Sequence, residues 1–148
     1  MLTKPPVVEV ADQPEPNPSF SYIADALRRR CEHPKGFNHP LDGWSTSDWF
    51  TAVMGELGEA ANVAKKLNRA RDGIPGNRET PAELQEKLAE ELADAYQYLE
   101  LLAQSCGINL AAAVMAKFNK TSRENGLPFF FTQYGTFCAV GETAHDDR

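Results

Sequence analysis

Four acidic residues form two pairs of equal spacing, Glu56 with Glu59 and Glu91 with Asp94. In a helix, residues three apart lie on one face with their Cβ atoms roughly 5–6 Å apart, so each pair could share one cation. Carboxylate oxygens are ligands that Mg²⁺ and Mn²⁺ prefer in proteins. The two pairs therefore indicate a site for one or more hard divalent cations.

The two pairs lie in a short internal repeat, in which residues 56–60 match residues 91–95. Hydrophobic residues recur at the same four offsets from the central residues Leu57 and Leu92: Val53, Ala60, Ala64 and Leu67 in the first copy, and Leu88, Ala95, Leu99 and Leu102 in the second. At about 100° per residue, Glu56 and Glu91 project into the apolar sector of their helices. Because unpaired carboxylates are costly to bury, this placement favours a bound metal.

A structural alternative exists for each pair taken alone. Glu-x-x-Glu is usually a solvated helix face, and Lys65, Lys66 and Lys87 are available as ion-pair partners. What distinguishes these acids is their repetition in one frame, with the first acid of each pair inside the apolar sector. We therefore interpret them as a metal site.

Periodicity and capping signals predict four helices that would position the acids, over residues 18–30, 45–71, 80–105 and 109–124. Ser45 with Asp48, and Thr80 with Glu83, have the spacing of capping boxes. Arg28, Arg29 and Arg30 follow one another where they would favour the negative end of the first helix. We expect an all-α fold, a bundle of about four helices.

The remaining segments divide the chain into three parts. Residues 1–18 contain five prolines among polar residues, which predicts a flexible arm. Residues 19–128 form the expected helical domain. Residues 129–148 are expected to be an irregular, aromatic C-terminal tail, in which a short strand and an extended covering segment are both open alternatives.

Composition narrows the classes of function. The chain has 148 residues and a net charge of −6, which argues against binding to nucleic-acid polymers or to anionic membranes. The sequence has no apolar run of about 18 residues, so we expect no membrane-spanning helix. Its three cysteines are scattered and odd in number, which favours a reducing, cytoplasmic setting over a disulfide framework.

Together these motifs resemble the MazG-like branch of the all-α nucleoside triphosphate pyrophosphohydrolases. The resemblance covers roughly residues 44–128 and includes the acid quartet and the runs 107–110 and 117–126. It implies Mg²⁺-dependent cleavage between the α- and β-phosphates of a (deoxy)nucleoside triphosphate. On this resemblance, the metal ligands and catalytic acids are Glu56, Glu59, Glu91 and Asp94, and one of them, with Glu90 nearby, orients or deprotonates the attacking water.

Phosphate binding calls for cations, and the fourth expected helix carries three candidates. Lys117 projects onto the same face as apolar residues, where its stem could instead cover the core edge. Lys120 and Arg123 are alternatives that could also serve the helix dipole. The resemblance adds Asn119, which would hydrogen-bond sugar or phosphate.

Aromatic residues are the candidates for stacking against the base. Tyr98 follows Asp94 by one turn, while Trp44 and Trp49 precede the first acid pair. Trp49 falls in the apolar sector, where a core role is the stronger interpretation. His33 and His39 lie in a loop that could cover the site.

Two other classes of helical protein share features with this sequence. A ferritin-like di-iron bundle needs Glu-x-x-His on two helices, and neither central helix contains a histidine. A non-catalytic helical module that binds a metal or a partner remains the alternative. Wide apolar sectors, and the resemblance, predict a homodimer or homotetramer. The preferred base and sugar are left open.

Overall fold

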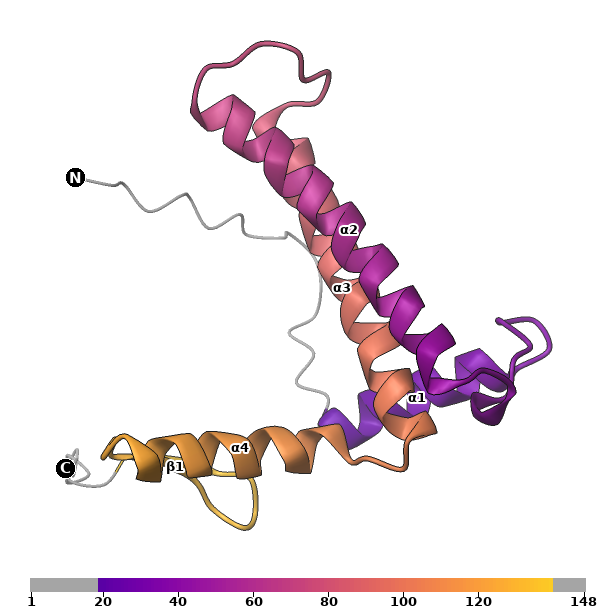
Figure 1. Ribbon diagram of the computed structural model, residues 1–148, viewed down its shortest axis with the longest axis vertical. Helices are drawn as coiled ribbons and strands as arrows, with labels where there is room; N and C mark the ends of the chain where they lie inside the picture. Colours follow the sequence, from indigo (N-terminus) through magenta and orange to yellow (C-terminus); the bar gives the residue numbers. More distant parts are fainter. Residues whose placement is uncertain (1–18, 140–148) are drawn as a thin grey trace, which may run out of the picture.

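The computed structural model describes residues 19–139, and their main elements are four α-helices (Figure 1). These helices are α1 (Phe20–Glu32), α2 (Thr46–Arg71), α3 (Pro81–Ser105) and α4 (Leu110–Glu124), with a short 3₁₀ helix η1 (Leu41–Gly43) between α1 and α2. The predicted all-α fold is confirmed, and the predicted helix bounds agree with the structure to within two residues. The predicted arm, residues 1–18, and residues 140–148 of the tail lie outside the described residues.

The long helices α2 and α3 lie side by side and antiparallel, and both start as the sequence predicts (Figure 1). At the start of α2, the Ser45 side chain accepts from the Asp48 amide while the Asp48 carboxylate accepts from the Ser45 amide. Thr80 and Glu83 form the same reciprocal pair at the start of α3. These capping boxes satisfy amides that have no partner within the helix, and so fix where each helix begins.

The main core lies where α1 and η1 pack against the start of α2 and the end of α3. Trp49 is its largest member, with only 1% of its surface exposed, and its indole N–H donates to the Leu41 carbonyl at 3.1 Å. Leu27, Cys31 and Leu101 pack around it. This core fixes one end of the α2–α3 hairpin and holds α1 beside the acidic residues.

The opposite end of the hairpin is held by an ion cluster. Lys66 of α2 and Lys87 of α3 both donate to Oε1 of Glu79, at 2.8 and 3.1 Å. These two hydrogen bonds lower the pKa of Glu79 to about 2. The cluster ties the α2–α3 loop to both helices.

Helix α4 turns away from α3 at 97° and packs mainly against a β-hairpin (Figure 1). The hairpin consists of β1 (Phe129–Phe131) and β2 (Phe137–Ala139), paired antiparallel. The side chain of Asn119 holds it to α4, accepting from the Phe131 amide at 2.7 Å and donating to the Phe131 carbonyl at 2.8 Å. Of the two alternatives open for the start of the tail, the strand is therefore the one found.

No single helix among residues 19–139 is long and apolar enough to cross a membrane; α3 and α4 pass such a test only when counted together, and they are sharply bent.

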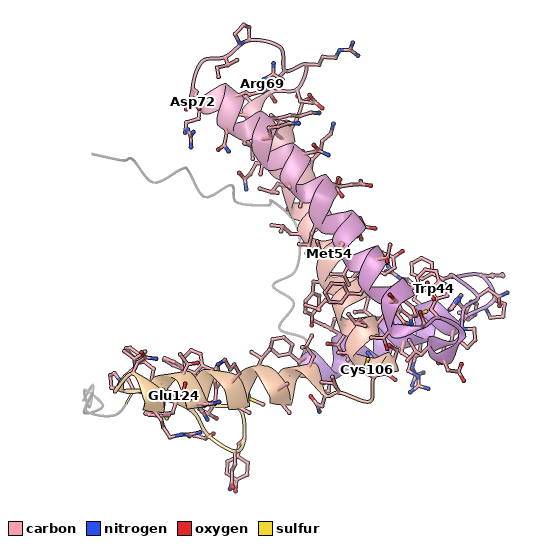
Figure 2. The ribbon with its side chains drawn as sticks, in the orientation of Figure 1. Trp44, Met54, Arg69, Asp72, Cys106 and Glu124 are labelled. Atoms are coloured by element: carbon pink, nitrogen blue, oxygen red, sulfur yellow. The ribbon has the colours of Figure 1, made fainter. Side chains whose placement is uncertain are left out.

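The α2–α3 hairpin leaves part of its apolar surface uncovered. Five large side chains there are 41–55% exposed, and we call them the exposed apolar face: Phe50, Met54 (labelled in Figure 2), Leu57, Leu92 and Leu99. The central leucines of the repeat, Leu57 and Leu92, belong to this face and not to the core. Each lies about 100–160° around its helix from the two acids of its own copy, so the acids and this face occupy different sides of the hairpin.

Candidate functional site

The antiparallel arrangement of α2 and α3 brings the two acid pairs together near the middle of the hairpin. Glu56, Glu59 and Glu91 each offer a carboxylate oxygen, and these oxygens all lie within 4.8 Å of one another. Glu56 and Glu91 are half-buried, whereas Glu59 is exposed. Three of the four predicted metal ligands therefore form one cluster with the geometry to hold a divalent cation.

The cluster is electrostatically strained in the absence of a cation. Partial burial raises the pKa of Glu56 above its usual range, and Asp94 and the other two glutamates raise it further. The pKa of Glu91 is raised by burial first, then by the negative charge of Glu59 and a hydrogen bond with it. Burial and, after it, repulsion between neighbouring carboxylates both oppose the ionised forms, and a bound cation would favour those forms.

Asp94, the fourth predicted ligand, lies at the edge of this cluster. Its Oδ1 atom accepts a 2.7 Å hydrogen bond from the side-chain amide of Gln97, one turn further along α3. Asp94 and Glu56 both line the same pocket. Asp94 thus connects the three-glutamate cluster to an open cavity where a substrate could reach it.

That pocket has a volume of about 550 Å³, within the range of roughly 300–1,000 Å³ typical of small-molecule sites. Residues from α1, the loop that follows it, α2 and α3 form its walls: Arg30, Lys35, Gly36, Phe37, Glu56, Asp94, Gln97, Tyr98 and Leu101. Its size suits a small molecule, and its lining combines charged, polar and aromatic side chains.

Tyr98, one of the predicted base-binding residues, lines this pocket. Its ring lies parallel to that of Phe37, with an interplanar angle of 3° and a centroid distance of 6.2 Å. Burial raises the pKa of Tyr98, and the negative charges of Glu56 and Asp94, which line the same pocket, raise it further. Of the three predicted aromatic residues, Tyr98 is therefore the one that lines the pocket together with the acids.

The two tryptophans do not line the pocket. Trp49 is in the core, as its place in the apolar sector indicated. Trp44 is 38% exposed and packs against Trp49 at a centroid distance of 4.7 Å and against His39 at 4.7 Å. His39 is thereby held beside the core. The Nδ1 atom of His33 accepts a hydrogen bond from the Lys35 amide. Neither histidine lines the pocket.

The predicted phosphate-binding residues of α4 do not meet the acids within the described chain. Lys117, Lys120 and Arg123 are exposed on a helix that leaves the hairpin, and Lys120 lies 3.6 Å from Glu124. Both polar atoms of the Asn119 side chain are engaged by Phe131. These residues remain candidates for phosphate binding only at a site where α4 of one copy would reach the acids of another copy.

Four of the charged, polar and aromatic residues of the pocket are absent from the sequence-based prediction: Arg30, Lys35, Phe37 and Gln97. A signal for Arg30 was present, because it precedes Cys31 and follows Leu27 by three residues, and both of those are buried. A helix with that buried side must turn Arg30 toward the body of the protein. The other three depend on how the loop folds back and could not be found from periodicity.

The loop after α1 curls tightly against that helix. The Phe37 amide donates to the Arg30 carbonyl at 3.3 Å, and the Gly36 amide donates to the His33 carbonyl at 2.8 Å. A Cβ atom at Gly36 would lie 1.9 Å from the Arg30 carbonyl oxygen, so only glycine permits this approach. The loop thereby places Lys35 and Phe37 beside Arg30.

Comparison with protein-family models, curated proteins and solved structures gives no significant match for this chain.

Proposed function

We propose that the protein is a divalent-cation-dependent nucleoside triphosphate pyrophosphohydrolase, which acts in the cytoplasm on small-molecule nucleotides. The observation that carries this proposal is the three-glutamate cluster beside a nucleotide-sized pocket with a parallel aromatic pair. The resemblance of the acid motifs to MazG-like enzymes supports the same reaction. Hydrolysis would yield a nucleoside monophosphate and pyrophosphate.

The residues present fit Mg²⁺ or Mn²⁺. All of the clustered ligand atoms are carboxylate oxygens, and no cysteine or histidine lines the adjoining pocket, a donor set that suits hard cations. Glu56, Glu59 and Glu91 would hold the cation, with Asp94 at its pocket side. When bound, a divalent cation supplies neutralisation of phosphate charge and a lower pKa for a coordinated water.

The chain's own residues would perform the remaining steps. Tyr98 stacks against the base, and one carboxylate of the cluster accepts a proton from the attacking water. The water oxygen forms a bond to the α-phosphorus, and the bond between that phosphorus and the oxygen bridging to the β-phosphate breaks. The bridging oxygen leaves with its electron pair as part of pyrophosphate.

A second copy of the chain would cover the exposed apolar face. Five large apolar side chains on two adjacent helices are more than a monomeric surface ordinarily exposes in one place. Because α2 and α3 carry matching stripes, the hairpin can pack against its own copy to form a four-helix interface. We therefore include a homodimer, or a homotetramer built from it, in the proposal.

The alternative is a non-catalytic helical module, and the same exposed apolar face is the observation in its favour. Thermal melts with and without Mg²⁺ or Mn²⁺ plus a triphosphate separate the two. A rise in melting temperature that needs both metal and triphosphate, and that Glu59→Gln removes and Glu86→Gln retains, supports the enzyme over a module that binds only a metal or a protein partner, because Glu86 is an exposed acid of α3 outside the cluster. A melting temperature that responds to neither metal nor nucleotide would favour the module.

A further inference from the structure

Three consecutive arginines at the end of α1 have different partners. Arg28 pairs with Glu32 at 3.1 Å, and Arg29 pairs with Asp25 at 2.7 Å, both on the exposed side of the helix. Arg30 has no carboxylate within 4 Å among residues 19–139. Its guanidinium instead donates to the side-chain oxygen of Gln97 and lies 5.5 Å from the centre of the Phe37 ring. Both of these partners are uncharged, so the charge of Arg30 is positioned without being neutralised.

Gln97 connects this arginine directly to the acidic site. Its oxygen accepts from Arg30, and its amide nitrogen donates to Asp94 Oδ1 at 2.7 Å. Arg30 therefore lies one side chain away from a predicted metal ligand, in the wall of the same pocket. This arrangement holds a cation and an anion near each other without letting them form an ion pair.

Lys35 adds a second positive charge to the same wall. It lines the pocket from the loop after α1, and within the part of the chain that the structure describes no carboxylate lies in ion-pair distance of it. Arg30 and Lys35 form what we call the basic wall of this pocket, and Glu56 and Asp94 form its acidic wall. Groups of unlike charge that line one cavity without forming ion pairs with each other are complementary to a ligand that carries both a cation and several anionic groups.

A metal-bound polyphosphate has that distribution of charge. Its α-phosphate would lie with the cation beside the carboxylates, and its further phosphates would extend toward the basic wall. Guanidinium groups suit phosphate because their planar N–H donors match two phosphate oxygens at once. A nucleoside monophosphate has no phosphate beyond the one beside the carboxylates, so it has none to offer the basic wall.

We propose that Arg30, assisted by Lys35, binds the β- and γ-phosphates of the substrate and stabilises the pyrophosphate as it leaves. This inference rests on the proposed function and adds the residues that recognise the phosphates beyond the α-phosphate. As the bond from the α-phosphorus to the bridging oxygen breaks, the electron pair passes to that oxygen. The N–H groups of Arg30 then hydrogen-bond the negative charge that has moved onto pyrophosphate.

Calorimetric titration of the full chain with inorganic pyrophosphate in Mg²⁺ tests this directly. Loss of one charged hydrogen-bond donor typically weakens binding by roughly tenfold or more. We expect that loss for Arg30→Gln and a smaller loss for Lys35→Gln, with wild-type affinity retained by the matched control Arg29→Gln. Affinity for a nucleoside monophosphate should be unchanged in all three variants, and affinity for Mn²⁺ should be unchanged in Lys35→Gln and Arg29→Gln.

The outcomes separate this inference from the proposed function. Equal pyrophosphate affinity in the wild type and in a folded Arg30→Gln protein would overturn the inference, even if the enzyme is active. If Arg30→Gln does not fold, as judged by its thermal melt, Lys35→Gln decides, because that side chain is exposed on a loop. A wild type that binds pyrophosphate through these residues but neither binds Mn²⁺ nor hydrolyses any triphosphate would support the basic wall and contradict the proposed function.

Discussion

Gln97 donates a 2.7 Å hydrogen bond to Asp94 from the next turn of the same helix, and this contact orients one of the two predicted metal ligands that line the pocket. Neighbours of metal ligands commonly change metal affinity by about 10–100-fold when they are removed. Gln97 is therefore a positioning residue, which acts through Asp94.

Replacing Gln97 with Met should keep the side chain's length and remove its hydrogen bonds. We expect Mn²⁺ affinity to fall by roughly tenfold, since Asp94 would lose its orientation. Titration with Mn²⁺ followed by paramagnetic resonance measures this without any need for activity. Gln85→Met, at an exposed position of the same helix, is the control, and equal Mn²⁺ affinity in the two variants would contradict the role given to Gln97.

The metal-free protein should become more stable as pH is lowered from neutrality into the acid range. The pKa values of Glu56 and Glu91 are raised in the folded state, so the folded protein binds protons more readily than the unfolded chain. Their contribution to the free energy of unfolding therefore falls as pH rises from the usual glutamate pKa through the raised value. Thermal melts in a chelator across this pH range measure the effect.

Glu91→Gln should flatten that pH dependence, and saturating Mg²⁺ should reverse its sign by favouring the ionised cluster. If the stability of the metal-free wild type instead rises with pH over the same range, the pKa values of Glu56 and Glu91 are not raised in the folded state. The ion cluster of Glu79 acts in the opposite direction: its pKa is lowered, so its stabilisation is lost only as pH falls from the usual glutamate pKa toward about 2.

The exposed apolar face predicts an oligomer that charge can dissociate. The double variant Leu57→Lys with Leu92→Lys places like charges on both helices of this face, where side chains are 42% and 52% exposed in the single chain. We expect the variant to keep its helical content and to elute as a monomer, whereas the wild type elutes as a dimer or larger. Size-exclusion chromatography with light scattering measures the mass, and a wild-type monomer at micromolar concentration would refute the interface.

Asn119 offers a test between a structural and a substrate-binding role. Asn119→Ala leaves the Phe131 amide and carbonyl without their partners, which typically costs about 1–3 kcal/mol for buried polar groups. We expect faster hydrogen exchange in residues 129–139 while the α2–α3 hairpin stays protected. If hydrogen exchange in the β-hairpin is unchanged and nucleotide binding is lost, the role of Asn119 is substrate binding.

Much of the fold was predictable because its signals are local. The capping boxes at Ser45 and Thr80 and the hydrophobic periodicity between them determine helix starts and lengths, and the structure agrees with both. The repeat also predicts that Glu56, Glu59 and Glu91 lie close together, because equal spacing on two antiparallel helices places them side by side.

What could not be predicted depends on contacts between distant segments. Periodicity places Leu57 in an apolar sector. It does not show that α1 and α3 cover only part of that sector and leave Leu57 exposed. Likewise, Arg30 meets Gln97 only because the core around Cys31 and Leu101 fixes the position of α1. The direction of α4, which moves Lys117 away from the acids, is set by the turn at residues 106–109 and not by the helix itself.

The central claim, hydrolysis at the α-phosphorus by the acid cluster, is tested most directly by following the water oxygen. The common ribo- and deoxyribonucleoside triphosphates are incubated with the full chain and Mg²⁺ in isotopically labelled water, and the products are analysed by mass spectrometry. The proposed function predicts, for at least one of them, labelled monophosphate with unlabelled pyrophosphate, and no product from Glu59→Gln. Label in orthophosphate with release of a diphosphate, no product from any triphosphate, or full activity in Glu59→Gln would contradict it.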